Sequence, residues 1–415
     1  MKAIVSKRGA EMPASPIRRL APAAEEAKRK GVRVIHLNIG QPDLPTPEPI
    51  LRRLGQIHDP VLCYAPSAGT PEFVRSVVEY YASNGIAVSA GEVLATTGGS
   101  EALLFALMAC CDPGDEAIVV EPFYTNYAAF AAMAGVRLVP VTSRGRDGFH
   151  LPPPELWERA LGERTRAILL CNPSNPTGTV YRPEELDMVA RLCRERGIFM
   201  LSDEVYREFV YDGRKAISAL SLEGMEQHVV VADSLSKRFN VCGIRLGMLV
   251  TRNREVFDAA YRMAQGRLSA PGLAQQVALG AGKIPESYLD GVIGEYRRRR
   301  DVLYEGLTSI PGVFLRQPEG AFYFIARLPV ADSDEFAAWL LSEFSLEGET
   351  VMVAPAAGFY ATPGLGTNEV RIAYVVGEEA LRRAVAILAR AIPEYRRIRA
   401  ESLPLEEPSE RSRRA

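Results

Sequence analysis

The sequence predicts an α/β protein built from two domains of unequal size, and three observations support this. A chain of 415 residues is longer than most single domains. Between about residues 46 and 290, short apolar runs alternate with segments of helical periodicity, a pattern typical of βαβ units on a mixed or parallel sheet. Beyond a long helical stretch, further strand-like runs and helical segments indicate a second, smaller α/β unit.

The elements follow one another along the chain. The first 45 or so residues are rich in proline and predict an irregular arm that contacts a neighbour. Strands of the larger unit are expected at EAIVVE, RLVPV, RAILLC, IFMLSD, HVVVAD and RLGMLV, with helices at 183–197 and 254–266. The helical stretch GVIGEYRRRRDVLYEGL leads to strands GAFYFIARL, TVMVAP and EVRIAYVV, with helices near 333–343 and 377–391.

Composition narrows the class of protein. Hydrophobic residues at 47% and charged residues at 24% are typical of a soluble globular protein. A formal charge of −2 gives no reason to expect a nucleic-acid partner, and we expect the run YRRRRD (296–301) to form a solvated helix face. No segment has the apolar core of a signal peptide or the length of a membrane span, so we expect a cytoplasmic protein with no membrane partner.

Cysteine and histidine usage gives no metal site. The six cysteines form no CxxC pair, which predicts reduced, buried thiols, and the four histidines form no HExxH or comparable spacing. Neither GxSxG nor GxxxxGK[ST] occurs, which disfavours a serine hydrolase and a P-loop nucleotidase.

Three polar segments adjoin predicted strands or helices. In TTGGSEALL (96–104), Ser100 suits a helix N-cap, and the glycine amides could bind a phosphate, although a plain helix start explains them too. In CNPSNPTG (171–178), Asn172 and Asn175 either cap a turn or donate to a ligand oxygen. In LSDEVY (201–206), Asp203 ends an apolar run and either caps a turn or requires a cation.

The segment SLSKRFNVCGIRLG (234–247) supplies two cations between apolar runs, Lys237 and Arg245. A lysine that forms an imine must lose its proton readily, and Lys237 is the candidate. Pyridoxal phosphate requires such a lysine, an acid at the pyridine nitrogen, for which Asp203 is available, and a phosphate site. The candidate phosphate ligands are Arg245, Ser234, Ser236, Ser100 and the Gly99 amide.

At these residues the chain resembles the class I aminotransferases of the fold-type I pyridoxal-phosphate enzymes, close to the bacterial aspartate aminotransferases. The resemblance covers about residues 30–395 and is carried, in family order, by NIGQPDLPTP, YAPSAGTPEF, TTGGSEAL, EPFYTNY, CNPSNPTG, LSDEVY, SLSKRFNVCGIRLG and NEVRIAYVV. It implies a large domain with a mostly parallel seven-stranded sheet and a smaller α/β domain. The expected division is an arm and part of the small domain at 1–45, the large cofactor-binding domain at 46–290, the small domain at 291–400 and a polar tail at 401–415.

The resemblance also implies residue roles. Lys237 looks like the Schiff-base and proton-shuttling lysine, Asp203 the partner of the pyridine nitrogen, and Tyr206 with Asn175 the donors to the ring hydroxyl. By the same resemblance the stacking aromatic is Tyr124, further cofactor contacts are Glu101 and Tyr64, and the substrate contacts are Arg371, Gly40, Asn175 and Ile39. Tyr64 would reach the phosphate of a neighbouring subunit, which implies a homodimer with shared active sites; the alternative is a core aromatic. For Arg371 the alternative is a surface salt bridge.

The function expected from this resemblance is a pyridoxal-phosphate aminotransferase. It would move the amino group of an L-amino acid, aspartate-type or of broad specificity, to a 2-oxo acid such as 2-oxoglutarate by a ping-pong mechanism. A carbon–sulfur lyase or other biosynthetic enzyme on the same scaffold is the alternative, and a cofactor-binding regulator ranks last. Arg267 in QGRLSAPG either binds a distal substrate carboxylate or is an exposed helix-end arginine.

Overall fold

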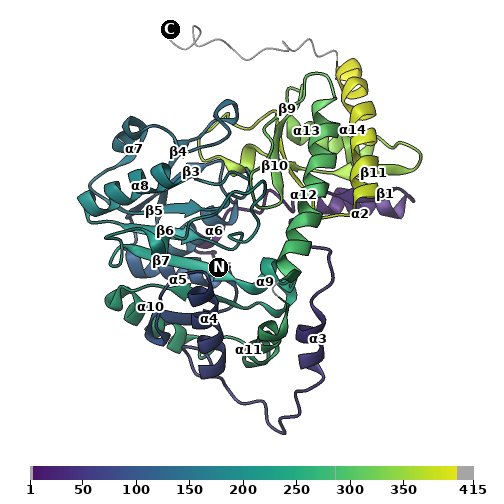
Figure 1. Cartoon of the computed structure of the whole chain (residues 1–415). Coiled ribbons are helices and arrows are strands. Elements are labelled where there is room, and N and C mark those ends of the chain that lie inside the picture. The colour runs from purple at the N-terminus through teal and green to yellow at the C-terminus, as the bar shows by residue number, and fades with distance from the viewer. Residues whose placement is uncertain (1–2, 286, 400–415) are drawn as a thin grey trace. The chain divides into compact units, whose positions relative to one another are not determined.

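The computed structural model describes residues 3–285 and 287–399, which fall into two compact units (Figure 1). Unit 1 comprises residues up to 14, 41–295 and 318–321, and unit 2 comprises 15–40, 296–317 and 322–399. The boundary at 295/296 falls inside the helix α12 (Ser287–Thr308). The tail expected at 401–415 lies outside the described residues.

Unit 1 contains a seven-stranded sheet. Its strands, in spatial order, are β2 (Val93–Thr96), β8 (Gly247–Val250), β7 (Val229–Ser234), β6 (Phe199–Asp203), β5 (Thr165–Cys171), β3 (Glu116–Glu121) and β4 (Arg137–Thr142). Neighbours from β7 to β4 run parallel, whereas β8 is antiparallel to both β2 and β7. This confirms the predicted mostly parallel seven-stranded sheet, although the sequence did not single out β2. Because the carboxyl ends of parallel strands share one edge, β5, β6 and β7 deliver Cys171, Asp203 and Ser234 to the same edge.

Besides α12, unit 1 has helices that contact this sheet and helices that lie elsewhere in the unit. They are α1 (Lys7–Ala10), α3 (Glu48–Leu54), α4 (Pro71–Ser83), α5 (Gly99–Cys110), α6 (Asn126–Ala134), α7 (Pro154–Ala160), α8 (Pro183–Arg196), α9 (Leu235–Arg238), α10 (Arg254–Gly266) and α11 (Gly272–Ala278). The helix α5 contacts β6, β7 and β8 and is itself contacted by α6 and α10. Cover from both sides explains why its sequence, GSEALLFALMAC, is apolar nearly all round.

Unit 2 contains two small sheets and three helices of its own. The parallel pair joins β1 (Arg33–His36) to β11 (Glu349–Met352). The antiparallel sheet has the order β12 (Ala354–Pro355), β13 (Glu369–Ala373), β10 (Tyr323–Arg327) and β9 (Phe314–Leu315). The helices are α2 (Ala21–Arg29), α13 (Ser333–Ser342) and α14 (Glu378–Arg399).

Three expectations from the sequence were wrong. The first 45 residues are not irregular, because they contain α2 and β1. The arginine run 296–301 is not a fully solvated face: Arg297 and Arg298 are exposed, but Arg299 and Arg300 are buried, and Arg299 Nη1 donates to the Val375 carbonyl at 2.6 Å. The six cysteines are free, but Cys63 is exposed and Cys242 is half-buried, so four of the six are buried as expected. Of the helices in the described ranges, none combines the length and apolarity that a membrane crossing demands.

Candidate active site

The candidate lysine lies in a short helix at the end of a central strand. The strand β7 ends at Ser234, whose Oγ caps α9 by accepting from the Ser236 amide at 3.2 Å. Lys237 is in α9, one helical turn beyond that strand end. Its Nζ lies 3.6 Å from Cys242 Sγ, and that thiol also donates to the Ser236 carbonyl at 3.3 Å. The amine is therefore in contact with a soft sulfur atom.

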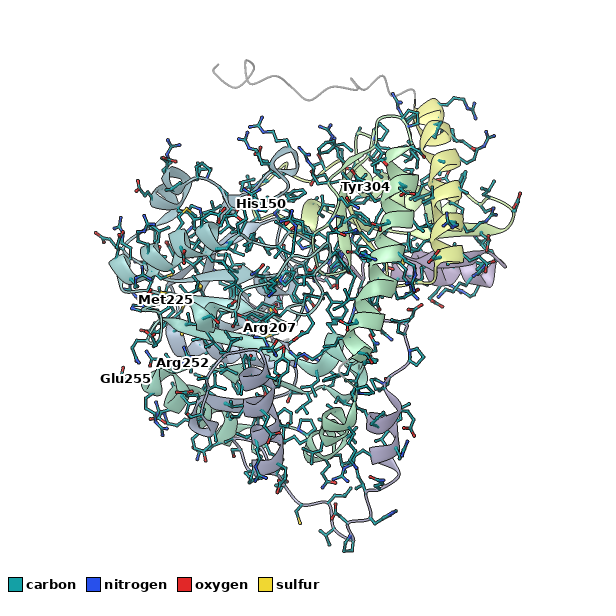
Figure 2. All side chains as sticks on the ribbon, in the orientation of Figure 1. His150, Arg207, Met225, Arg252, Glu255 and Tyr304 are labelled. Carbon is teal, nitrogen blue, oxygen red and sulfur yellow. The ribbon has the colours of Figure 1, made fainter. Side chains whose placement is uncertain are left out.

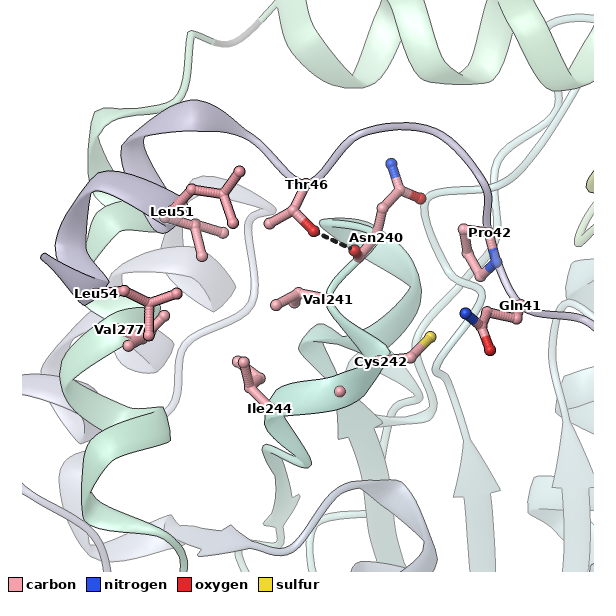
Figure 3. Close-up of a pocket in the computed structure, with 12 residues that line it drawn as sticks. Gln41, Pro42, Thr46, Leu51, Leu54, Asn240, Val241, Cys242, Ile244 and Val277 are labelled. Carbon is pink, nitrogen blue, oxygen red and sulfur yellow. Dashed lines mark hydrogen bonds between the residues drawn. The ribbon is translucent and has the colours of Figure 1, made fainter.

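A cavity of about 250 Å³ within unit 1 borders this turn (Figure 3). Thr46 Oγ1 donates to the Asn240 carbonyl at 2.6 Å on one side of it. Most of its side chains are apolar, and the lining consists of Gln41, Pro42, Thr46, Ile50, Leu51, Leu54, Asn240, Val241, Cys242, Gly243, Ile244 and Val277. Two lining residues contact Lys237: Cys242 through its thiol, and Asn240 through its backbone amide, which donates to the Lys237 carbonyl at 3.3 Å.

The candidate acid, Asp203, ends β6 and is 4% exposed. Its Oδ2 accepts from the Tyr127 hydroxyl at 2.6 Å and its Oδ1 from the Val205 amide at 3.3 Å. Both donors are neutral. Burial raises the pKa of Asp203 to about 6, although the Tyr127 hydrogen bond opposes this shift. A cation placed against this carboxyl would offset the free-energy cost of keeping its negative charge away from water.

The two asparagines of the 171–178 turn have different surroundings. Asn172 stabilises the turn. Its side-chain Oδ1 accepts from the Tyr181 backbone amide at 3.0 Å, and its backbone amide donates to the Asp203 carbonyl at 3.0 Å. Asn175 is 3% exposed, and its Nδ2 lies 3.4 Å from Tyr206 Oη. The side chains of Asn175 and Tyr206 therefore form a pair of buried polar groups.

Two backbone segments approach closely enough to form an anion cradle. A Cβ on Gly98 would lie 2.6 Å from Arg245 Nη2, and a Cβ on Gly247 would lie 2.6–2.8 Å from backbone atoms of Asp233, Gly98 and Gly99. Gly98 has φ +76°, which only glycine adopts readily. The start of α5, the Arg245 guanidinium and the buried hydroxyls of Ser234 and Ser236, 2.9 Å apart, therefore gather at one place.

The start of α5 differs from the sequence prediction. Its N-cap is Gly98 rather than Ser100, which is the second residue of the helix. The reason is the close packing at Gly98 and Gly99, which starts the helix two residues earlier than an N-cap at Ser100 would. Glu101 accepts from the Thr97 amide at 2.8 Å and pairs with Arg267 at 3.0 Å. Arg267 does end the helix α10, but its side chain is only 18% exposed.

The predicted stacking aromatic lies next to a residue that the sequence did not single out. The Tyr124 ring packs edge-on against Tyr127, with centroids 5.5 Å apart, and its hydroxyl accepts from Asn126 Nδ2 at 2.9 Å. Tyr127 was missed, although its position three residues after Tyr124 at the start of a helix places the two rings side by side. Tyr64 is 82% exposed, so it is not a core aromatic of unit 1.

The expected substrate residues Arg371, Gly40 and Ile39 belong to unit 2. Arg371 lies in β13 and is 2% exposed, which excludes the surface salt bridge considered for it. Its Nη2 donates to the Asn38 carbonyl at 2.5 Å, and its guanidinium lies 4.6 Å from the Tyr323 ring centroid. A Cβ on Gly40 would lie 1.8 Å from Tyr323 Oη, so this position requires glycine. Ile39, beside it, is 43% exposed.

Comparisons with known proteins agree with this arrangement. The family described as "Aminotransferase class I and II" matches residues 32–388. The aspartate/prephenate aminotransferase of Thermus thermophilus is 33% identical, over 89% of this chain and 94% of its own. A solved single mutant of Thermus thermophilus aspartate aminotransferase has a TM-score of 0.86 at 32% identity, covering 94% of this chain and all of that one. An alanine aminotransferase from Pyrococcus furiosus has the same TM-score at 29% identity, covering 94% of this chain and all of its own.

Proposed function

The chain belongs to the class I and II aminotransferases, and from this premise we propose which residues carry out the transamination and on which substrates. Pyridoxal 5′-phosphate binds in unit 1, with Lys237 as the lysine that bonds to it. The amino group of an L-amino acid passes to a 2-oxo acid such as 2-oxoglutarate in two half-reactions. The observation that carries the assignment is the carboxyl of Asp203, which is buried at the same sheet edge that leads to Lys237 and accepts from two neutral donors, the Tyr127 hydroxyl and the Val205 amide.

The residues present fit this cofactor at each of its polar groups. A protonated ring nitrogen would supply the cation that Asp203 lacks among its hydrogen-bond partners. The Asn175 and Tyr206 side chains offer donors for the ring hydroxyl. The cradle at Gly98, Gly99 and Arg245, with the two serine hydroxyls, offers amide, guanidinium and hydroxyl donors for the phosphate.

When bound, the cofactor supplies an electron sink for the pair of electrons left as the substrate loses its α-proton. Lys237 Nζ, once free, takes that proton from the substrate α-carbon, as a general base must. Asp203 holds its negative charge against the ring nitrogen. Arg371 is assigned to the substrate α-carboxylate, for which a guanidinium offers two parallel donors.

The substrates are proposed to be aspartate-type amino acids, or a broader set, with 2-oxoglutarate as acceptor. The relatives support this choice, since their names include aspartate, prephenate and alanine. A carbon–sulfur lyase activity is not favoured by any of these relatives. A homodimer with shared active sites is also proposed. It is supported by Tyr64 and by four neighbouring apolar residues that are exposed in the single subunit, namely Leu51, Leu54, Val61 and Leu62.

Lys237→Ala tests the proposal. The variant should bind pyridoxal phosphate but lack the absorbance band of the lysine-linked cofactor, and borohydride should fix no cofactor to it. Transamination of aspartate should fall by about 10²–10⁴-fold, the usual contribution of a general base. Lys215→Ala, at an exposed lysine, is the matched control and should behave as wild type. Transamination by the Lys237 variant at the wild-type rate would exclude the mechanism.

A further inference from the structure

Glu101 and Arg267 form an ion pair between two helices of unit 1, 166 residues apart in sequence. Arg267 Nε lies 3.0 Å from Glu101 Oε1 and 3.1 Å from Oε2, and both side chains are 18% exposed. A pair with so little access to water is less screened than a surface salt bridge. We refer to these two residues as the Glu101–Arg267 clamp.

Each member of the clamp also holds the chain that leads into α5. Glu101 Oε2 accepts from the Thr97 amide at 2.8 Å, and Arg267 Nη2 donates to the Ala95 carbonyl at 2.7 Å. Ala95 belongs to β2, and Thr97 begins the turn that ends at Gly98. The clamp therefore fixes this segment through the Thr97 amide and the Ala95 carbonyl, which belong to residues two positions apart.

This turn lies close to Arg245. A Cβ on Gly98 would lie 2.6 Å from Arg245 Nη2, and Gly247 packs against the backbone of Gly98 and Gly99 with no room for a side chain. The directions of the first amides of α5 depend on this packing. A displaced turn would misdirect the donors that a phosphate requires.

Charge gives the clamp a second role. Glu101 is in the first turn of α5, where a carboxylate interacts favourably with the helix but would repel a phosphate bound at the same end. The Arg267 guanidinium neutralises that carboxylate. Without it, the cradle would contain an uncompensated negative charge beside the anion that it has to bind.

We propose that the Glu101–Arg267 clamp positions and neutralises the phosphate-binding turn of this aminotransferase, so that Arg267 is a positioning residue for the cofactor. The proposal rests on the proposed phosphate site at Gly98, Gly99 and Arg245. It replaces the expectation that Arg267 binds a distal substrate carboxylate, because the Nε and Nη2 donors of Arg267 are already engaged within the subunit.

The test compares two ligands that differ only in the phosphate. Apoenzyme of the Arg267→Met variant is titrated with pyridoxal 5′-phosphate and with pyridoxal, followed by absorbance and protein fluorescence. Affinity for pyridoxal phosphate should fall by about tenfold, the order expected when one partner of a partly buried ion pair is removed, while affinity for pyridoxal stays within about twofold. Equal loss for both ligands would mean a general structural defect and would overturn the proposal.

Three further variants separate charge from geometry. Glu101→Gln combined with Arg267→Met should recover most of the lost affinity, because glutamine can still accept from Thr97 while the unpaired charge is gone. Arg267→Lys should lie between Arg267→Met and wild type, since it keeps the charge. Arg254→Met, at the other end of α10, is the control and should leave both affinities unchanged. A double variant no better than Arg267→Met would exclude the neutralising role.

Substrate selectivity provides an independent outcome. The ratio of kcat/KM for aspartate to that for alanine, measured at saturating pyridoxal phosphate, should be the same in Arg267→Met and wild type. A selective loss for aspartate and glutamate, with cofactor affinity intact, would identify Arg267 as a substrate-binding residue and overturn the proposal. If the wild-type protein bound no pyridoxal phosphate, the proposed function itself would fail, and this result is distinguishable from the others.

Discussion

Two clusters of charged side chains in unit 1 differ in how much water reaches them. The lysine-side cluster, next to Lys237, consists of Asp233, Arg238, Glu208, Arg207 and Glu204, and none of its side chains is more than 10% exposed. The His150 cluster consists of His150, Glu185, Glu319 and Arg214, with side chains 12–46% exposed. His150 and Arg207 are labelled in Figure 2.

In the lysine-side cluster every charge has a close partner. Arg238 Nη2 lies 2.7 Å from Asp233 Oδ2, its Nε lies 3.1 Å from Glu208, and its guanidinium lies 3.6 Å from the Tyr80 ring centroid. Arg238 follows Lys237 in sequence, and Glu204 follows Asp203. Buried ion pairs add little net stability relative to apolar packing, so we interpret this cluster as a device that fixes the backbone beneath the two site residues.

The His150 cluster is shallower and joins different segments. His150 Nδ1 lies 3.0 Å from Glu185 Oε2 and Nε2 lies 3.7 Å from Glu319 Oε1. The hydrogen bonds with Glu185 and Glu319 raise the pKa of His150 to about 9. The stability that the His150 cluster contributes therefore depends on pH. The contribution of the lysine-side cluster is governed instead by how deeply its charges are buried. Removing one charge should therefore lower the unfolding free energy most in the cluster where water is least able to replace the lost partner.

The largest effect is expected for Arg238→Met. The substitution leaves Asp233 buried without Arg238 and Glu208 with the more distant Arg207, 3.9 Å away, and breaking a buried pair in this way costs about 3–5 kcal/mol of unfolding free energy. Denaturant unfolding of the apoenzyme measures the change. A decrease in unfolding free energy of less than about 1 kcal/mol would show that water reaches the lysine-side cluster. The two clusters would then not differ in how much the loss of one charge destabilises the fold.

An intermediate effect is expected when His150 loses its proton. The folded-state pKa is raised above the ordinary value of 6.5, so the stabilisation is fully present below pH 6.5 and is lost as the pH rises through about 9. After allowance for solvent screening, we expect a loss of about 1–2 kcal/mol in unfolding free energy across this window.

His150→Gln is the control for this pH dependence. Unfolding free energies measured from pH 6 to pH 10 should show a smaller decline between pH 6.5 and 9 in the variant than in the wild type. Parallel curves for the two proteins would contradict the assignment of the decline to His150.

Local sequence patterns predicted the larger unit well, because most of its strands are continuous β-branched runs such as EAIVVE and HVVVAD between turn residues. The misses have a common cause. The two missed strands, β1 and β2, pair with β11 and β8 far along the chain, and the partner of β1 begins only at Glu349. Strands of that kind depend on long-range pairing, which no local window contains.

The site residues divide in the same way, into those that a local sequence pattern reveals and those whose role depends on a distant partner. Lys237, Asp203 and Asn175 could be singled out because each stands in a compact polar segment beside an apolar run. Tyr127 could not, since its role depends on Asp203, 76 residues later, and the partner of Arg267 is 166 residues earlier. From the sequence, Arg267 and Arg254 are both arginines at the ends of one predicted helix, and nothing local distinguishes them.

The smallest effect is expected for Arg254→Met. Arg254 Nη2 lies 2.8 Å from Asp258 Oδ1, but the two side chains are 71% and 38% exposed. Water and salt replace such a partner at little cost, so the loss of unfolding free energy should stay below about 0.5 kcal/mol. Denaturant unfolding alongside Arg238→Met measures both ends of the comparison under one condition. Suppose instead that Arg254→Met lowers the unfolding free energy by about 1 kcal/mol or more, on the order of a well-placed charged hydrogen bond. Solvent exposure would then fail to predict how much each ion pair stabilises the fold, and hydrogen-bond geometry would be the stronger determinant.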